Sequence, residues 1–244
     1  MGEKEEDTPR TACQHFIMKR DTSADMKETD VYNRRRVSSG IYCTGTDGSR
    51  IMIVGNSITF HEPNADIGWE GSWGMAASAQ NKDYVSLLYK KVCSVCGDAV
   101  FCVAHAGAWE RAFWDTSSLN PLKAVKEFSP EVFIFRLGEN VLPKTCEQYS
   151  LSEGISRLVR FLTVPQKTKM IFTTCFWENP IINPIITESA SVLGARLVEL
   201  SDLGSNDKMK ATGLFEHSGV AAHPNDAGMN EIARRIWEEL RLML

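Results

Sequence analysis

No stretch of the 244-residue sequence approaches the roughly 20 consecutive apolar residues that a membrane-spanning helix needs. The longest apolar clusters, such as residues 170–177, have the length of a strand and are interrupted by threonine. The first 30 residues are polar and lack the apolar run of about 7 to 15 residues that secretory signals contain. We therefore expect no membrane partner and a cytoplasmic location.

An excess of positive charge is also lacking. Lysine and arginine number 27 against 31 aspartates and glutamates, so the formal net charge is −4. Nucleic-acid binding depends on cationic side chains that displace counterions from phosphates, and this chain has no general cationic field. The short basic run at residues 34–36 is expected to be a solvated surface. We therefore expect no nucleic-acid partner.

The seven cysteines are too scattered for the disulfide framework of a small secreted protein, and an odd number cannot all pair within one chain. Cys93 and Cys96 have the spacing of a redox or zinc motif, but no second pair of metal ligands stands at a useful distance. We interpret the cysteines as reduced structural thiols. No metal and no organic cofactor are expected.

Hydrophobic residues make up 43% of the chain and charged residues 24%, which is close to globular averages and predicts a compact fold. Residues 1–36 contain few large apolar groups, so we expect them to form a polar, partly mobile extension. Residues 37–244 are predicted to form one domain, and residues 37–43 are expected to form a short strand or hairpin at its start.

After residue 50, short apolar runs alternate with longer stretches of helical period, which is the pattern of βαβ units. The runs are nearly continuously apolar, as strands covered on both faces are. Strands are predicted at residues 51–55, 99–104, 132–137, 169–175 and 196–200, and helices at 82–95, 121–128, 148–162, 184–193 and 226–242. We therefore predict an α/β fold, a three-layer α/β/α sandwich around a five-stranded parallel sheet with a flavodoxin-like strand order.

In such a sheet the ligand site lies beyond the carboxyl ends of the strands, so the residues that follow each strand are the most informative. Ser57 follows the first predicted strand, Gly107 the second and Asn140 the third, while His223 precedes the last helix. A hydroxyl, a glycine amide, a side-chain amide and an imidazole are thereby predicted to meet at one edge of the sheet.

This combination of groups is typical of a serine hydrolase. A serine hydroxyl is a weak nucleophile until a neighbouring imidazole takes its proton, and His223 is the candidate base for Ser57. The tetrahedral intermediate needs donors already aimed at its oxyanion; we assign this role to the N–H groups of Ser57 and Gly107 and to the side-chain amide of Asn140. Each residue alone also fits an ordinary turn, cap or loop position, and only the combination favours catalysis.

These residues and their neighbours resemble the sequence blocks of the SGNH hydrolases, also called the GDSL esterase/lipase superfamily. The resemblance rests on Gly107 and on the segments 55–59, 138–140 and 223–228. Asn56 and Val141 depart from the family pattern, because both stand where the family usually has aspartate. The resemblance implies the flavodoxin-like sandwich predicted above and the hydrolysis of esters, often acetyl or longer acyl esters of sugars, lipids or small metabolites.

A further departure concerns the acid that orients the histidine. The family usually has an aspartate three residues before it, and this chain has Val220 there. Loss of that acid lowers turnover about 10⁴-fold in one well-studied triad. We consider two replacements, namely a backbone carbonyl that would leave a Ser-His dyad, and the carboxylate of Glu216, seven residues before His223.

The loop after the nucleophile is rich in tryptophan and glycine. Trp69 and Trp73 are predicted either to wall the substrate pocket, where an indole face stacks on a sugar ring, or to pack locally as a hydrophobic plug. Trp109 and Trp177 are candidates for the same rim. Arg136, inside a predicted strand, is expected either to be a buried charge with a partner or to reach the rim.

The leading hypothesis is a serine esterase that hydrolyses a small acyl ester, most of all an acetyl ester of a carbohydrate or other polar alcohol, through an acyl-enzyme intermediate. A lysophospholipase or thioesterase is the alternative within enzymes. A hypothesis of another class is a ligand-binding protein with impaired catalysis on the same fold, motivated by Val220 at the acid position. The expected partner is a small-molecule ester.

Overall fold

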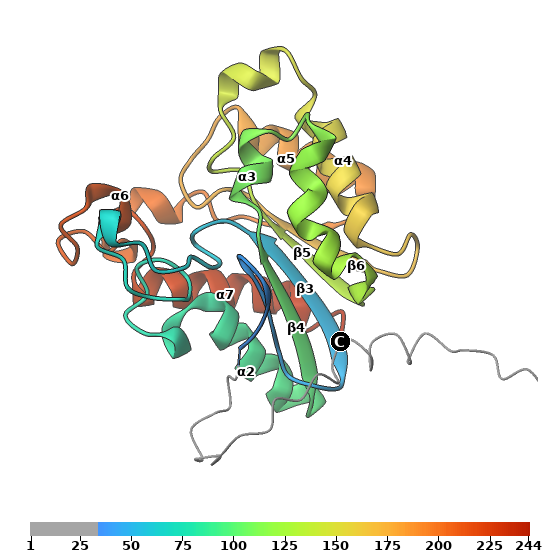
Figure 1. Ribbon diagram of the computed structural model, residues 1–244, viewed down its shortest axis with the longest axis horizontal. Helices are drawn as coiled ribbons and strands as arrows, with labels where there is room; N and C mark the ends of the chain where they lie inside the picture. Colours follow the sequence, from blue (N-terminus) through green and yellow to red (C-terminus); the bar gives the residue numbers. More distant parts are fainter. Residues whose placement is uncertain (1–33) are drawn as a thin grey trace, which may run out of the picture.

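The computed structural model describes residues 34–244 and contains a seven-stranded sheet (Figure 1). The strands are β1 (Arg35–Ser38), β2 (Ile41–Thr44), β3 (Ser49–Gly55), β4 (Ala99–His105), β5 (Val132–Arg136), β6 (Lys169–Thr173) and β7 (Arg196–Val198). Their order across the sheet is β1-β2-β4-β3-β5-β6-β7, and the strands from β3 to β7 pair in parallel. Numbered by themselves, these five have the order 2-1-3-4-5, which confirms the predicted flavodoxin-like sheet.

Two strands add to the five that were predicted for the sheet. β1 and β2 form an antiparallel hairpin, and β2 pairs antiparallel with the edge of β4. The turn between them contains Gly40, whose φ of 69° favours glycine. All four residues of β2 are buried, and alternate side chains enter the two hydrophobic layers on opposite faces of the sheet. The hairpin therefore belongs to the sheet rather than only leading into it.

The helices cover both faces of the sheet (Figure 1). They are α2 (Tyr84–Cys96), α3 (Gly107–Arg111), α4 (Leu151–Leu162), α5 (Ile182–Leu193), α6 (Ser218–Ala221) and α7 (Asp226–Leu240). The 3-10 segments are η1 (Ala65–Ile67), η2 (Gln80–Lys82), η3 (Thr116–Phe128), η4 (Pro143–Glu147), η5 (Leu203–Ser205) and η6 (Asp207–Met209). The helix predicted at residues 121–128 lies within η3, and its residues take the tighter 3-10 form around Pro121.

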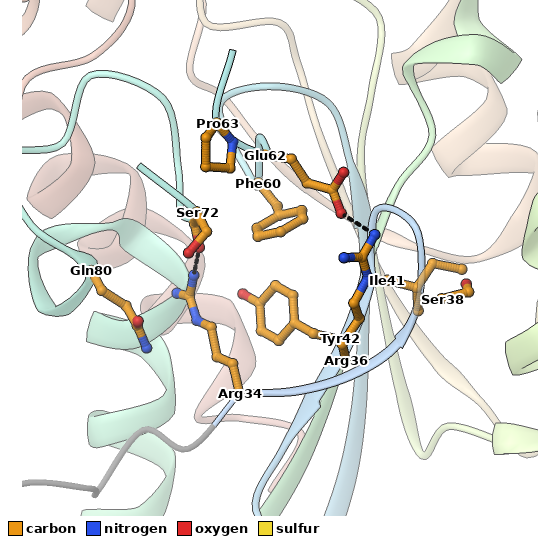
Figure 2. Close-up of a pocket in the computed structure, with 10 residues that line it drawn as sticks. All are labelled: Arg34, Arg36, Ser38, Ile41, Tyr42, Phe60, Glu62, Pro63, Ser72 and Gln80. Carbon is orange, nitrogen blue, oxygen red and sulfur yellow. Dashed lines mark hydrogen bonds and ion pairs between the residues drawn. The ribbon is translucent and has the colours of Figure 1, made fainter. Parts of the chain in front are cut away.

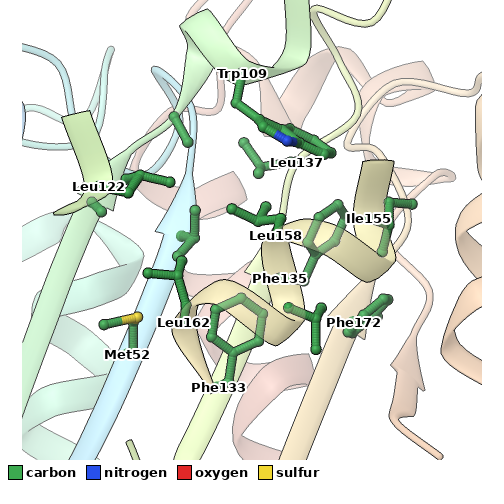
Figure 3. Packing of buried hydrophobic residues seen from close by; sticks show 14 of the residues in the cluster. Met52, Trp109, Leu122, Phe133, Phe135, Leu137, Ile155, Leu158, Leu162 and Phe172 are labelled. Carbon is green, nitrogen blue, oxygen red and sulfur yellow. The ribbon is translucent and has the colours of Figure 1, made fainter. Parts of the chain in front are cut away.

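Two apolar clusters fill the space between the sheet and the helices. One joins α2 and α7 to one face, and the other joins α3, η3, α4 and α5 to the opposite face. Figure 3 shows the second cluster, with Trp109 of α3 at one end and Phe133 and Leu162 at the other. Trp109 packs edge-on against Phe135 with ring centroids 6.0 Å apart. This packing anchors α3 above the end of β5.

The first described residues pack on the domain. The side chain of Arg34 is 10% exposed, forms an ion pair with Asp83, donates to Ser86 Oγ at 3.0 Å and lies over the Tyr42 ring at 4.5 Å. Arg36 is 68% exposed, so only part of the basic run is the solvated surface that was expected. The predicted extension at residues 1–36 falls mostly outside the described residues.

Within residues 34–244, no helix combines the length and the apolar character needed to cross a membrane. The six cysteines in this range are all free thiols.

Candidate active site

Ser57 lies in a tight turn that follows β3 at the carboxyl edge of the parallel strands. The N–H of Thr59 donates to the carbonyl oxygen of Asn56 at 2.9 Å, which closes the turn. Only glycine fits at position 55, because a Cβ there would lie 1.9 Å from Thr59 Oγ1. The carbonyl of Ser57 accepts from the N–H of Met75 at 2.8 Å. The turn is therefore held from both sides, with Ser57 half-buried.

His223 lies in the loop between α6 and α7, 166 residues after Ser57, and the fold brings the two side chains together. The distance between Ser57 Oγ and His223 Nε2 is 2.8 Å. On the other side of the ring, Nδ1 lies 2.6 Å from the carbonyl oxygen of Gly219 in α6. Nδ1 must carry the hydrogen in this contact, because a carbonyl oxygen can only accept. Nε2 is then free to accept the proton of the Ser57 hydroxyl.

The surroundings of His223 favour the neutral imidazole. Burial lowers the pKa of His223 to about 4, against an opposing contribution from the hydrogen bond to the Gly219 carbonyl. The ring of Trp177 packs edge-on against the imidazole, with centroids 5.5 Å apart. Trp177 therefore lies at the rim of the site, one of the positions proposed for it from the sequence. A neutral imidazole at pH 7 is ready to act as a base.

A backbone carbonyl, and no carboxylate, contacts Nδ1 of His223 in the described structure. The Nδ1 of His223 contacts the Gly219 carbonyl oxygen, whereas Glu216 is exposed to solvent. Of the two replacements considered for the missing aspartate, the geometry matches the backbone carbonyl and the Ser-His dyad.

Two backbone N–H groups are available beside Ser57. Gly107 is the first residue of α3. The residue before it, Ala106, donates its N–H to the Gly55 carbonyl oxygen at 2.7 Å, and this hydrogen bond connects the end of β4 to the end of β3. Within residues 34–244, neither the N–H of Ser57 nor that of Gly107 has a hydrogen-bond acceptor. Both N–H groups are thus left without an acceptor in the described part of the chain, and their role in binding an oxyanion stays a prediction.

Asn140 follows β5 in the next segment of the same edge. Gly138 has a φ of 143°, and a Cβ there would lie 2.7 Å from Cys175 Sγ, so this turn requires glycine. The Asn140 side-chain Nδ2 donates to Glu110 Oε2 at 2.6 Å. A side-chain amide has two N–H groups, so one remains for the predicted oxyanion hole.

Beneath these donors lies a buried cluster of charged side chains, Glu110, Glu139 and Arg136. Asn56 Nδ2 donates to both carboxylates, at 3.1 Å to Glu110 and 2.6 Å to Glu139. Arg136 Nη1 donates to Glu139 at 2.5 Å, so Arg136 is a buried charge with a partner. Burial and the charge of Glu139 raise the pKa of Glu110, while its N–H donors lower it.

Two hollows lie on the side of the site toward the β1–β2 hairpin. The smaller, of about 330 Å³, is lined in part by His61 and His105. The His105 ring packs close to Gly107, since a Cβ at position 107 would lie 2.9 Å from His105 Cε1. The larger, of about 520 Å³, shares Phe60 and Glu62 with the smaller one. Figure 2 shows this larger hollow, with an aromatic floor and polar side chains around it.

The tryptophans of the loop after Ser57 pack against each other and against Phe215. Trp69 is 3% exposed and lies between Trp73 and Phe215, with ring centroids 5.7 and 6.0 Å away. The indole N–H of Trp73 donates to the Ala77 carbonyl oxygen at 2.8 Å. This arrangement is the hydrophobic plug, the second of the two interpretations of this loop. Trp109 is also buried in the core instead of at the rim.

In the part of the chain that the structure describes, no group of three or more histidine, cysteine, aspartate or glutamate side chains is arranged to hold a metal ion.

The sequence did not indicate two parts of this site. Glu110 lies in α3, which at five residues is too short to produce a helical period. An acid three residues after a candidate oxyanion glycine is the only signal that points to it. The Gly219 carbonyl is a backbone group, so no residue type reveals it.

Comparison with known proteins gives the fold. The chain matches a solved structure of a family two carbohydrate esterase from Cellvibrio japonicus with a TM-score of 0.50 and 15% identity, over 80% of this chain and 61% of that one. It thus spans less than two thirds of that protein. A protein of Parabacteroides merdae described as GDSL-like matches with a TM-score of 0.50 and 12% identity, over 78% of this chain and 94% of the other. Protein-family models and curated protein sequences give no significant match. The chain therefore has the SGNH hydrolase fold.

The environment of His223 predicts an unusually acidic imidazole. We expect its pKa near 4, compared with about 6.5 for a solvated histidine, because burial disfavours the charged ring. An NMR titration of the ring C–H resonances, assigned by their loss in His223→Asn, measures this value. A midpoint at about 6 or above would show that the ring is not desolvated as described.

Proposed function

We propose that the protein is a serine esterase that uses a Ser-His dyad. The observation that carries the proposal is the 2.8 Å contact between Ser57 Oγ and His223 Nε2, next to backbone N–H groups that have no acceptor within the described residues. In the first step, Ser57 Oγ attacks the ester carbonyl carbon while His223 Nε2 takes the hydroxyl proton. The carbonyl oxygen becomes an oxyanion, held by the N–H groups of Ser57 and Gly107 and by Asn140.

The tetrahedral intermediate then collapses. The bond to the alcohol oxygen breaks, His223 returns its proton to that oxygen, and Ser57 keeps the acyl group as an ester. In the second half, a water molecule gives a proton to His223 Nε2 and attacks the acyl carbon. Collapse of this second intermediate releases the acid and restores the Ser57 hydroxyl. Throughout, the Gly219 carbonyl accepts the hydrogen of Nδ1, so that Nε2 is the atom that takes and returns the proton.

For the substrate we propose a small acyl ester, such as an acetyl ester, of a carbohydrate or another polar alcohol. Two hollows on the hairpin side of the site support a polar alcohol, because charged and hydrogen-bonding side chains such as Arg36, Glu62 and Gln80 line them, although neither Ser57 nor His223 does. The similarity in fold to a carbohydrate esterase agrees with it. Ring stacking on Trp69, which the sequence suggested for a carbohydrate, does not support this choice, because Trp69 is buried.

The principal test is covalent labelling of the nucleophile by a fluorophosphonate probe. We expect stoichiometric labelling of the wild type and none of Ser57→Ala, with p-nitrophenyl acetate hydrolysis lost in parallel. Ser205→Ala is a matched control, because Ser205 lies in η5 and its hydroxyl donates to the Asp202 carbonyl. Folded wild-type protein that remains unlabelled would favour the ligand-binding alternative.

The acyl preference separates the esterase from the lysophospholipase or thioesterase alternative. On a series of p-nitrophenyl esters of increasing chain length, we expect kcat/KM to be highest for acetate and to fall steadily, because charged and hydrogen-bonding side chains line the hollows beside the site. A maximum at chains longer than about eight carbons would instead indicate a lipid-like substrate, since each buried methylene contributes about 0.8 kcal/mol of binding.

Glu216 is expected to be dispensable for orienting the base. Because the Gly219 carbonyl holds Nδ1 and Glu216 is exposed, Glu216→Gln should keep kcat/KM for p-nitrophenyl acetate within about twofold of the wild type, whereas an orienting acid has effects of several orders of magnitude. Glu178→Gln, at another exposed glutamate, is the matched control. A loss of kcat/KM of about 100-fold or more in Glu216→Gln, but not in the control, would instead show that the Glu216 carboxylate orients His223.

A further inference from the structure

Glu110 joins the three segments of the proposed site that follow strands, namely those that carry Ser57, Gly107 and Asn140. Its side chain is completely buried in α3, above the ends of β3 and β5. Four N–H groups donate to its carboxylate: Asn56 Nδ2 at 3.1 Å, Gly138 N at 2.6 Å and Asn140 N at 3.3 Å to Oε1, and Asn140 Nδ2 at 2.6 Å to Oε2. The mechanism above gives this carboxylate no chemical role.

The orientation of the Asn140 amide depends on this carboxylate. Within residues 34–244, Glu110 Oε2 is the only hydrogen-bond partner of Asn140 Nδ2. With one N–H directed at Glu110, the direction of the other is fixed, since both belong to one planar group. Without Glu110 the amide is free to rotate, and the other N–H no longer has a defined direction.

Glu110 also acts on the segment that carries Ser57. The Asn56 side chain donates to Glu110 and Glu139, and its Oδ1 accepts from the N–H of Ile58 at 3.2 Å. One side chain thereby braces the turn on both sides of Ser57. The same carboxylate thus holds the turn of the nucleophile and the amide donor of the next strand in one arrangement.

From this geometry we propose that Glu110 is a positioning residue, which directs the free N–H of Asn140 toward the oxyanion, while Glu139 also holds the Asn56 side chain beside Ser57. Glu110 touches no reacting atom. The inference rests on the proposed esterase function and deepens it. Preorganised donors lower the barrier because they need no reorientation as the charge develops.

A carboxylate is required at this position, because both of its oxygens accept. Glutamine at position 110 would replace one of these oxygens by an NH2 group. That NH2 group would face either Asn140 Nδ2 or the N–H groups around Oε1, so two hydrogen-bond donors would point at each other. The least costly response is rotation of the Asn140 amide, which places its oxygen against the new NH2. That rotation moves the Asn140 NH2 away from its present position, while the side chain at position 110 keeps its size.

A double-mutant cycle tests this role with p-nitrophenyl acetate as substrate. We expect Glu110→Gln to lower kcat about 10- to 100-fold with KM within about twofold, because a misdirected donor weakens only transition-state binding. In the background of Asn140→Ala the same substitution should change kcat less than about threefold, because the donor that it misdirects is already absent.

If Glu110 only supports the fold, its effect on kcat should be as large in the Asn140→Ala background as in the wild type, and this result would overturn the proposal. Glu127→Gln, the same substitution at an exposed residue of η3, should leave kcat unchanged. Urea unfolding of each variant measures its stability. If Glu110→Gln does not fold, Glu110→Asp replaces it in the cycle, since its carboxylate is shorter by one methylene and cannot reach Gly138 and Asn140 together.

The outcomes for the two proposals are distinct. Hydrolysis by the wild type tests the esterase function by itself, and a folded wild type without hydrolysis would overturn both proposals. An active wild type in which Glu110→Gln and Asn140→Ala act independently would overturn only the role of Glu110.

Discussion

The site depends on the position of β3 between β4 and β5. Gly55, at the end of β3, stands in register with His105 of β4 on one side and Arg136 of β5 on the other. The three segments that leave these strands therefore start at one level of the sheet, and they carry Ser57, Gly107 and Asn140. β3 is also the switch point from which the chain winds in both directions, where such sheets form their ligand sites. Without this register the donors would be spread along the edge.

The charges beneath the site carry a cost in stability. Arg136 is completely buried, and its Nε and Nη2 have no hydrogen-bond partner in the described structure. Buried charges lose their hydration, and a single ion pair rarely compensates for it fully. Apolar side chains of the same size would serve the core equally well. The cluster instead positions a side chain. Glu139 and Glu110 both accept hydrogen bonds from the Asn56 amide and thereby hold it beside the turn that contains Ser57.

Much of this arrangement was predictable from local patterns. Continuous apolar runs gave the five parallel strands, and the rule that ligands bind beyond their carboxyl ends directed attention to Ser57, Gly107, Asn140 and His223. Short elements were missed, because the five residues of α3 and the four of α6 are too few for a periodic signal. The burial of individual side chains in the loops depended on packing between segments that are distant in the sequence. The burial of Trp69 against Phe215 joins segments about 146 residues apart, which no local pattern reveals.

Asn56 shows how a departure from a family pattern becomes intelligible in three dimensions. With Glu110 and Glu139 both within hydrogen-bond distance of its Nδ2, an aspartate at position 56 would bring a third negative group into a buried space that contains one guanidinium. The amide instead supplies the hydrogens that the two carboxylates need.

The contact between Gly219 and His223 has an evolutionary consequence. A carboxylate that orients a histidine disappears with one codon change, and it loses its charge in acid. A peptide carbonyl does neither, since every residue supplies the same oxygen and it does not titrate in the physiological range. The contact therefore depends on the path of the main chain through α6, and a substitution there that keeps this path keeps the oxygen in place. An amino-acid motif would therefore not reveal such a contact, whereas the course of the backbone around the histidine does.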